Sequence, residues 1–223
     1  MTQQDQGFLI VDNVFTRAAM EGILRALAAA DLDRTKAGAR HVLSVPAVRQ
    51  LALDSRMVGI ARQFVGPLAT AFRATLFDKS AQANWLVIWH QDTALPLRER
   101  IDEPTWGPWS NKAGVLYAHA PAWALEQVVA LRVSLDDSLA TNGPLRVLPA
   151  THRRGLLGDR QIEQFAREIA AVECVAPSGG VVAMCPLTLH ASSKVVEDRP
   201  RRILHIEYAA GLRLAPGVEL AVA

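Results

Sequence analysis

The stretch QVVALRVSLDDSLATNGPLRVL (residues 127–148) contains two short runs rich in valine and leucine, separated by polar residues. Runs of this kind, bounded by turn residues, are typical of β-strands. Asn142, Gly143 and Pro144 favour a turn between the two runs. The stretch therefore predicts two strands, at residues 127–136 and 144–148, and with them a β-rich fold.

Similar runs lie on both sides of this pair, beginning after Gly66-Pro67. They are short, rich in β-branched and aromatic residues, and separated by turn residues, so each predicts a strand. These further strands are expected at residues 68–77, 84–90, 113–119, 171–176, 180–185 and 201–210. One helix, at about 159–169, is expected to interrupt them.

The first third of the chain has helical periodicity instead. Thr16 can cap a helix from Arg17 to Ala30, and a second helical region from Pro46 to Val65 begins with a residue suited to a first turn. Eight short strands behind such a helical layer predict a mainly β fold with flanking helices. Its core is expected to be a double-stranded β-helix, a cupin-like jelly roll. An immunoglobulin-like sandwich is the competing fold, but the helical preface and the lack of paired cysteines count against it.

Length and charge narrow the class of protein further. A chain of 223 residues suits one domain, with the helical layer at about 16–65 and the jelly-roll core at about 68–210. The formal net charge of +2 is too small to indicate a nucleic-acid partner. No apolar run approaches about 18 residues and no secretory leader is visible, so we expect a cytoplasmic protein without a membrane partner. The sequence leaves the oligomeric state open.

The segment NWLVIWHQD (84–92) ends a predicted strand with two residues that can bind a metal, His90 and Asp92. Positions i and i+2 of a strand share a face, so both side chains can point at one spot. Two histidines and one carboxylate on one face of an octahedron form the facial triad of non-haem iron(II) oxygenases, which leaves three positions open. His-x-Asp alone is a weak signal, because a structural histidine at a strand end followed by a surface aspartate gives the same sequence pattern.

A second group of polar residues lies about a hundred residues further on, in MCPLTLHASSKVVEDRPRRILHIEYA (184–209). His190 follows an apolar strand, and the early and late strands of a jelly roll lie side by side, so His190 can complete the triad. Ser192 lies two residues beyond it. Arg201 opens the last strand, where a planar guanidinium can hold the distal carboxylate of a dicarboxylate. Metal ligands, a hydroxyl and a fixed cation are the parts that a 2-oxoglutarate site needs.

Three motifs together resemble the phytanoyl-CoA dioxygenase (PhyH) family: WHQD (89–92), LRVSLDDSLATNGPLRVLPATH (131–152) and LHASS…DRPRRILHIEY (189–208). The resemblance covers nearly the whole chain, from GFLIVDNVF (7–15) to the last strand. It implies an oxidoreductase that uses Fe(II), 2-oxoglutarate and O2, and that hydroxylates an unactivated C–H bond of a small-molecule substrate with release of succinate and CO2.

The resemblance also implies a role for individual residues. It makes His90, Asp92 and His190 the iron ligands and Arg201 the anchor of the distal carboxylate of 2-oxoglutarate. Ser192 matches a hydroxyl that assists that anchor. Asn84, six residues before the first histidine, matches a polar co-substrate contact in some relatives.

The sequence departs from the family pattern in two places. Many relatives carry a tryptophan on the central strand beside the co-substrate, whereas LRVSLDD (131–137) offers Arg132 or Ser134, which leaves that wall of the pocket undecided. The peroxisomal address of the mammalian members is missing, so phytanoyl-CoA itself is not the expected substrate. The carboxylate of Asp92 is retained, which favours hydroxylation over the halogenation carried out by relatives that lack it.

Several residues are weaker candidates for contact with the substrate. Residues 93–114 form a long connection directly after the first metal-binding strand, and we expect a lid in which Trp106 and Trp109 contact the substrate. The alternative is a surface loop held in place by the two tryptophans. His119 and Lys79 are further candidates; the alternatives are a structural histidine and a solvated lysine at a strand end.

Two functions of other classes compete with the oxygenase. A catalytically silent jelly-roll ligand-binding protein would not need the complete triad together with Arg201. A cupin-type metalloenzyme that does not use 2-oxoglutarate usually has His-x-His, which this sequence lacks. Desaturation and cyclisation follow from the same oxidant as hydroxylation, so the sequence does not choose among them, nor does it identify the substrate.

Overall fold

The computed structural model describes residues 4–79, 86–197 and 199–223. Three helices form the N-terminal layer: α1 (Arg17–Ala29), α2 (Pro46–Ala52) and α3 (Ser55–Val65). The helical region expected over 46–65 divides in two because Asp54 caps α3, its side chain accepting a hydrogen bond from the amide of Arg56 at 2.9 Å. Two later helices are α4 (Ala122–Leu125) and α5 (Asp159–Glu168), and within the described residues no helix is long and apolar enough to cross a membrane.

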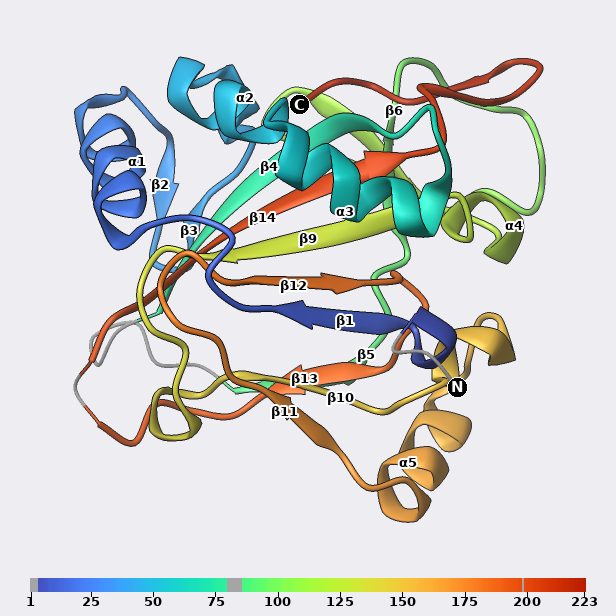
Figure 1. Ribbon diagram of the computed structural model, residues 1–223. Helices are drawn as coiled ribbons and strands as arrows, with labels where there is room; N and C mark the ends of the chain where they lie inside the picture. Colours follow the sequence, from blue (N-terminus) through green and yellow to red (C-terminus); the bar gives the residue numbers. More distant parts are fainter. Residues whose placement is uncertain (1–3, 80–85, 198) are drawn as a thin grey trace.

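A large antiparallel sheet of seven strands lies beneath α1, α2 and α3 (Figure 1). Its strands, in their order across the sheet, are β1 (Phe8–Val11), β12 (Val181–Met184), β9 (Val128–Ser134), β14 (Arg201–Ala209), β4 (Thr70–Lys79), β3 (Gly38–Ala39) and β2 (Arg34–Thr35). Except for β3 and β2, neighbours in this order are not consecutive short-range hairpins, as in a jelly roll, where strands alternate between two sheets.

A second sheet of four strands lies on the other side of the large sheet from α1, α2 and α3 (Figure 1). Its order is β11 (Val172–Cys174), β10 (Leu145–Val147), β13 (His190–Ser192) and β5 (Val87–His90). The predicted mainly β fold with flanking helices and a jelly-roll core is therefore confirmed. The two strands predicted from residues 127–148 are β9 and β10, and they lie in different sheets.

Side chains alternate between the two faces of the large sheet, which separates the core from the interior of the jelly roll. On β14, Leu204, Ile206 and Tyr208 pack into the hydrophobic cluster shared with the helical layer. The intervening residues His205 and Glu207 point the other way and are also buried, at 4% and 1% exposure. Buried ionisable groups are costly unless they are paired or bind a ligand, so this interior face is a candidate for a binding site.

Residues 93–114 do not form the expected long loop. They contain β6 (Ala94–Leu97) and β7 (Trp109–Lys112), which pair with β8 (Val115–His119) in a three-stranded sheet. Trp106 is only 4% exposed and packs edge-on against Trp123 within a second hydrophobic cluster. Strand pairing and tryptophan packing hold most of the segment in place. This arrangement is closer to the alternative interpretation, a segment held by its tryptophans, than to a lid. A last hairpin, β15 (Arg213–Ala215) and β16 (Val218–Glu219), ends the chain.

Candidate metal centre

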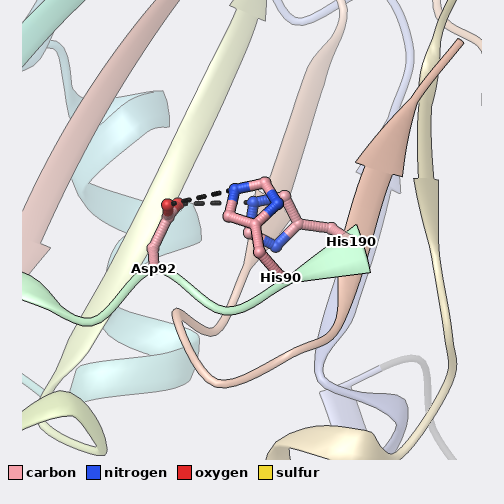
Figure 2. A group of neighbouring side chains, drawn as sticks. All are labelled: His90, Asp92 and His190. Atoms are coloured by element: carbon pink, nitrogen blue, oxygen red, sulfur yellow. Dashed lines mark ion pairs between the residues drawn. The ribbon is translucent and has the colours of Figure 1, made fainter. Parts of the chain in front are cut away.

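Two neighbouring strands bring together side chains that are a hundred residues apart in sequence (Figure 2). His90 is the last residue of β5 and His190 the first of β13, and the two are opposite each other in the antiparallel ladder. Their ring centroids are 4.2 Å apart. Asp92 follows two residues after His90, and its amide donates to the carbonyl of Pro186, on the segment leading to β13, at 3.0 Å.

The distances among these three side chains suit a shared metal ion. Nε2 of His90 lies 3.7 Å from Oδ1 of Asp92, and Nε2 of His190 lies 3.5 Å from Oδ2 of Asp92. Both distances exceed an ordinary hydrogen bond. Two atoms bound to one ion at about 2.1 Å each lie no more than about 4.2 Å apart, so both contacts can be bridged. One ligand atom from each of the three residues can be chosen so that all lie within 4.8 Å of one another.

The backbone sets the tautomer of each histidine. Nδ1 of His90 lies 2.8 Å from the carbonyl oxygen of Ile88, and Nδ1 of His190 lies 2.9 Å from that of Thr188. A carbonyl oxygen can only accept, so each Nδ1 carries the proton and each Nε2 keeps a lone pair. Such hydrogen bonds orient metal-binding histidines in proteins. The lone pairs of both rings thus face Asp92.

The electrostatic environment also keeps the group in its metal-binding state. Burial disfavours the charged form of Asp92, but His190, His205, His90 and Arg73 outweigh this effect and hold its pKa at about 2. Burial lowers the pKa of His190 to about 4, although Asp92 opposes the shift. At neutral pH the carboxylate is ionised and His190 is neutral, which are the forms that coordinate metals.

Gln91, between the two residues of the motif, has a structural role that the sequence reasoning missed. Its Nε2 donates to the carbonyls of Leu187 at 2.7 Å and Gly155 at 2.9 Å, and its Oε1 accepts from the amide of Leu157 at 2.9 Å. Leu187 belongs to the segment that leads to His190. Gln91 therefore ties the end of β5 to the chain that carries the third side chain of the group. A buried side-chain amide needs such partners. No spacing or pattern in the sequence indicates that Gln91 has them.

We expect Gln91→Leu to weaken metal binding while all three metal-binding side chains remain. Loss of the side-chain hydrogen bonds loosens the register between β5 and the 185–190 segment, and supporting groups of this kind typically contribute about 10–100-fold to affinity. Calorimetric titration with Mn(II) measures the effect, at a temperature where the variant's circular dichroism shows it folded. Gln50→Leu, at an exposed position on α2, is the control. Equal affinities in the two variants would contradict this role.

One cavity beside the group, the Arg201 pocket, has a volume of about 130 Å³. His90, Asp92 and His190 line it, together with Lys79, Arg132, Ser192 and Arg201 among others. Nζ of Lys79 donates to Oγ of Ser192 at 3.1 Å, and Nε of Arg201 donates to the carbonyl of Asn142 at 3.1 Å. Burial and the proximity of Arg132 lower the pKa of Arg201 to about 9, and burial with both arginines lowers that of Lys79 to about 8. Three crowded cations suit an anionic occupant.

A second cavity, the Lys112 pocket, has a volume of about 300 Å³ and shares Phe77 and Asp92 with the first. The remaining lining residues are Arg40, Arg73, Thr75, Gln91, Thr93, Ala94, Lys112, Tyr117, His119 and His205. Asp92 lines both cavities, whereas His90 and His190 line only the Arg201 pocket. The candidate metal position therefore lies at the boundary between the two.

The predicted site residues fall on different sides of this boundary. Ser192 and Arg201 line the Arg201 pocket beside the metal-binding group, and Arg132 rather than Ser134 forms its undecided wall. Lys79, which the sequence offered as a substrate contact, lines the same pocket. His119 lines the Lys112 pocket, where its Nδ1 lies 2.7 Å from Oγ1 of Thr93.

The two tryptophans predicted to contact substrate lie elsewhere. Trp106 belongs to the second hydrophobic cluster and Trp109 packs against it, and neither lines either pocket. Their spacing in a long connection suggested a lid, whereas burial of their apolar rings determined their place. Asn84 lies outside the described residues. Sequence reasoning did not single out Arg40, Arg73, Lys112 or Tyr117, because single basic residues on strands and turns carry no distinctive spacing.

Comparison with solved structures identifies proteins of the same fold. EctD from S. alaskensis in its apo form is 18% identical, with a TM-score of 0.69 over 94% of this chain and 77% of that one. SnoK from nogalamycin biosynthesis, described as a non-heme alpha ketoglutarate dependent carbocyclase, is 15% identical, with a TM-score of 0.69 over 94% and 85%. HygX from Streptomyces hygroscopicus, with nickel and 2-oxoglutarate bound, is 16% identical, with a TM-score of 0.65 over 92% and 84%.

A search of curated protein sequences returned no match. Among family models, the one described as "Phytanoyl-CoA dioxygenase (PhyH)" matches residues 3–203. The matched region includes both strands of the metal-binding group and the first residues of β14, Arg201 among them.

Proposed function

The chain belongs to the phytanoyl-CoA dioxygenase family, and from this premise we propose that it is an Fe(II)- and 2-oxoglutarate-dependent oxygenase. The proposed reaction is hydroxylation of an unactivated C–H bond of a small-molecule metabolite, with release of succinate and CO2. The observation that carries the proposal is the position of His90, Asp92 and His190 against a buried pocket of three cations.

The donor set fits iron(II). Two imidazole nitrogens and one carboxylate form the facial triad of non-haem iron oxygenases, and the backbone hydrogen bonds leave the Nε2 lone pairs of both histidines available. EctD has a solved structure with bound Fe. We propose that His90, Asp92 and His190 hold the metal.

The Arg201 pocket fits a dicarboxylate such as 2-oxoglutarate. It has metal-binding side chains at one part of its wall and Arg201, Lys79 and Ser192 at another. Lys79, Arg132 and Arg201 concentrate positive charge on the wall of this pocket, and a dianion is complementary to such a field. We propose that Arg201 holds the distal carboxylate of 2-oxoglutarate, assisted by Ser192. We propose that Lys79 contacts the same carboxylate, because its side chain already donates to Ser192.

When bound, iron and 2-oxoglutarate would supply the activation of O2 and the oxidation of the C–H bond. The chain's own contribution is to keep Asp92 ionised and His190 neutral, to hold both rings through the carbonyls of Ile88 and Thr188, and to place the co-substrate on the Arg201 side. The Lys112 pocket, on the other side of Asp92, is the place for the substrate. The helical layer packs on the sheet that carries Arg201, so we propose that helices and jelly roll act as one domain.

The visible spectrum of the anaerobic protein with Fe(II) and 2-oxoglutarate tests the proposal without a known substrate. We expect a weak metal-to-ligand charge-transfer band, because a keto acid that chelates iron(II) through two oxygens produces one. Fe(II) binding without the band would favour a cupin-type metalloenzyme that does not use 2-oxoglutarate. A band without any succinate formed after prolonged exposure to O2 would favour a catalytically silent ligand-binding protein.

A further inference from the structure

The Lys112 pocket has an excess of positive charge. Three cationic side chains line it, Arg40, Arg73 and Lys112, against a single carboxylate, Asp92. In the proposed function that carboxylate is already used, because it faces a metal ion that is itself positive. The positive charge of the cavity therefore has to be balanced by another protein group, by a bound anion or by solvent.

Arg73 does not account for the excess, because it is neutralised from within the protein. Its Nε and Nη2 both contact the carboxylate of Glu207, the latter at 2.6 Å, and its Nη1 donates to the carbonyl of Ala94 at 3.2 Å. Glu207 is 1% exposed and its pKa is lowered, since Arg73 and His205 outweigh the effect of burial. Of this buried pair, Arg73 lines the cavity.

Arg40 and Lys112 are different: within the described residues, neither has a carboxylate partner. Arg40 follows β3 and is exposed, whereas Lys112 ends β7 and is half-buried. Nζ of Lys112 lies 4.9 Å from the centre of the Tyr117 ring. Burial and the positive charges of Arg40 and Arg73 lower the pKa of Lys112, although Asp92 opposes the shift, so Arg40 and Lys112 are close enough to repel each other.

A hydrogen bond joins the segment that carries Arg40 to the hairpin that carries Lys112. Nε2 of His41, next to Arg40, lies 2.9 Å from the hydroxyl of Tyr117 on β8. β8 pairs with β7, and Lys112 is opposite Val115 at the end of that hairpin. The chain turns there through Ala113 and Gly114, with φ of 48° and 81°. Like charges held together in this way favour an anion between them.

We infer that the substrate is a small anion whose carboxylate or phosphate group binds between Arg40 and Lys112, with the rest of the molecule extending toward Asp92 and His119. This inference rests on the proposed function, because it takes the Lys112 pocket as the substrate side of the metal centre. A cavity of about 300 Å³ is at the lower end for ligand pockets, which limits the substrate to a small metabolite. In this inference the substrate lies in the Lys112 pocket and not beside Trp106 and Trp109, where the sequence led us to expect it.

Simple anions test the site. The protein is saturated with Mn(II) and 2-oxoglutarate, which fills the Arg201 pocket without turnover, and is then titrated with sulfate, phenylacetate, phenyl phosphate and the neutral analogue phenylacetamide. We expect the anions to bind and to raise the unfolding temperature, and phenylacetamide to have at least a tenfold weaker effect. Phenylacetate and phenyl phosphate distinguish a carboxylate from a phosphate as the preferred group.

Variants locate the binding. Hydrogen bonds to charged groups typically correspond to about a tenfold change in affinity or more, so Arg40→Gln and Lys112→Gln should each weaken anion binding about tenfold, and the double variant about a hundredfold. Lys36→Gln removes an exposed cation from the turn between β2 and β3 and should bind anions like the wild type. The inference is overturned if no anion binds better than phenylacetamide, or if the double variant matches Lys36→Gln.

This result is separable from that of the proposed function. If the wild type gives no charge-transfer band with Fe(II) and 2-oxoglutarate but still binds anions through Arg40 and Lys112, the anion site stands and the oxygenase does not. If the band appears and the anion titration fails, the oxygenase stands and its substrate is not recognised through these cations.

Discussion

Asp92→Ala and His190→Ala proteins are expected to form no succinate from 2-oxoglutarate above the background of free Fe(II), with or without substrate. Each substitution removes one of the three side chains that converge on the candidate metal position. Asp92 supplies the only negative charge of the three, so its loss leaves two neutral nitrogens to hold a dication. Loss of His190 leaves one imidazole nitrogen and one carboxylate as protein ligands from this group.

The measurement is succinate formation, followed by NMR, together with the charge-transfer band. Asp33→Ala, which removes an exposed carboxylate remote from both pockets, is the control and should behave like the wild type. Thermal unfolding of each variant separates loss of the metal from loss of the fold. Wild-type succinate formation by either folded variant would overturn the ligand assignment.

Arg201→Ala is expected to raise the Kd for 2-oxoglutarate about a hundredfold, whereas Arg202→Ala should change it less than about twofold. The two residues are adjacent on β14 and point to opposite faces. Arg201 is 5% exposed in the pocket, and removing one partner of a buried charge pair costs about 2–5 kcal/mol, with 1.4 kcal/mol for each tenfold. Arg202 instead pairs with Asp136 at 2.7 Å, so its loss should cost at most about 1 kcal/mol of stability.

Titration of the charge-transfer band with 2-oxoglutarate gives both dissociation constants. Arg201→Lys, which keeps the charge but not the planar two-donor geometry, should bind with intermediate affinity. Equal dissociation constants for Arg201→Ala and Arg202→Ala would show that another cation anchors the co-substrate, and Lys79 and Arg132 line the same pocket.

Local patterns in the sequence were sufficient for most of the fold. Short β-branched runs predicted the strands β4, β5, β8, β9, β10, β11, β12 and β14 within a few residues, because strand formation depends on alternation and on turn residues that are local. They did not predict the short strands β1, β2, β3, β13, β15 and β16. They also did not predict β6 and β7, whose residues include a proline and a lysine. Pairing with β8 and packing of Trp106 place that segment, and neither interaction is written in its own sequence.

The same division applies to the site. The His-x-Asp spacing puts His90 and Asp92 on one side of a strand end, and the resemblance to the family indicated His190, Ser192 and Arg201 as their companions. The tertiary structure alone decided that Lys79 lies with Arg201, that Trp106 lies in a core cluster, and that Arg40 and Lys112 line one cavity. Periodicity determines which face of its own strand a side chain occupies. Pairing between distant strands determines which faces meet, and therefore which charges are neutralised and which are left for a ligand.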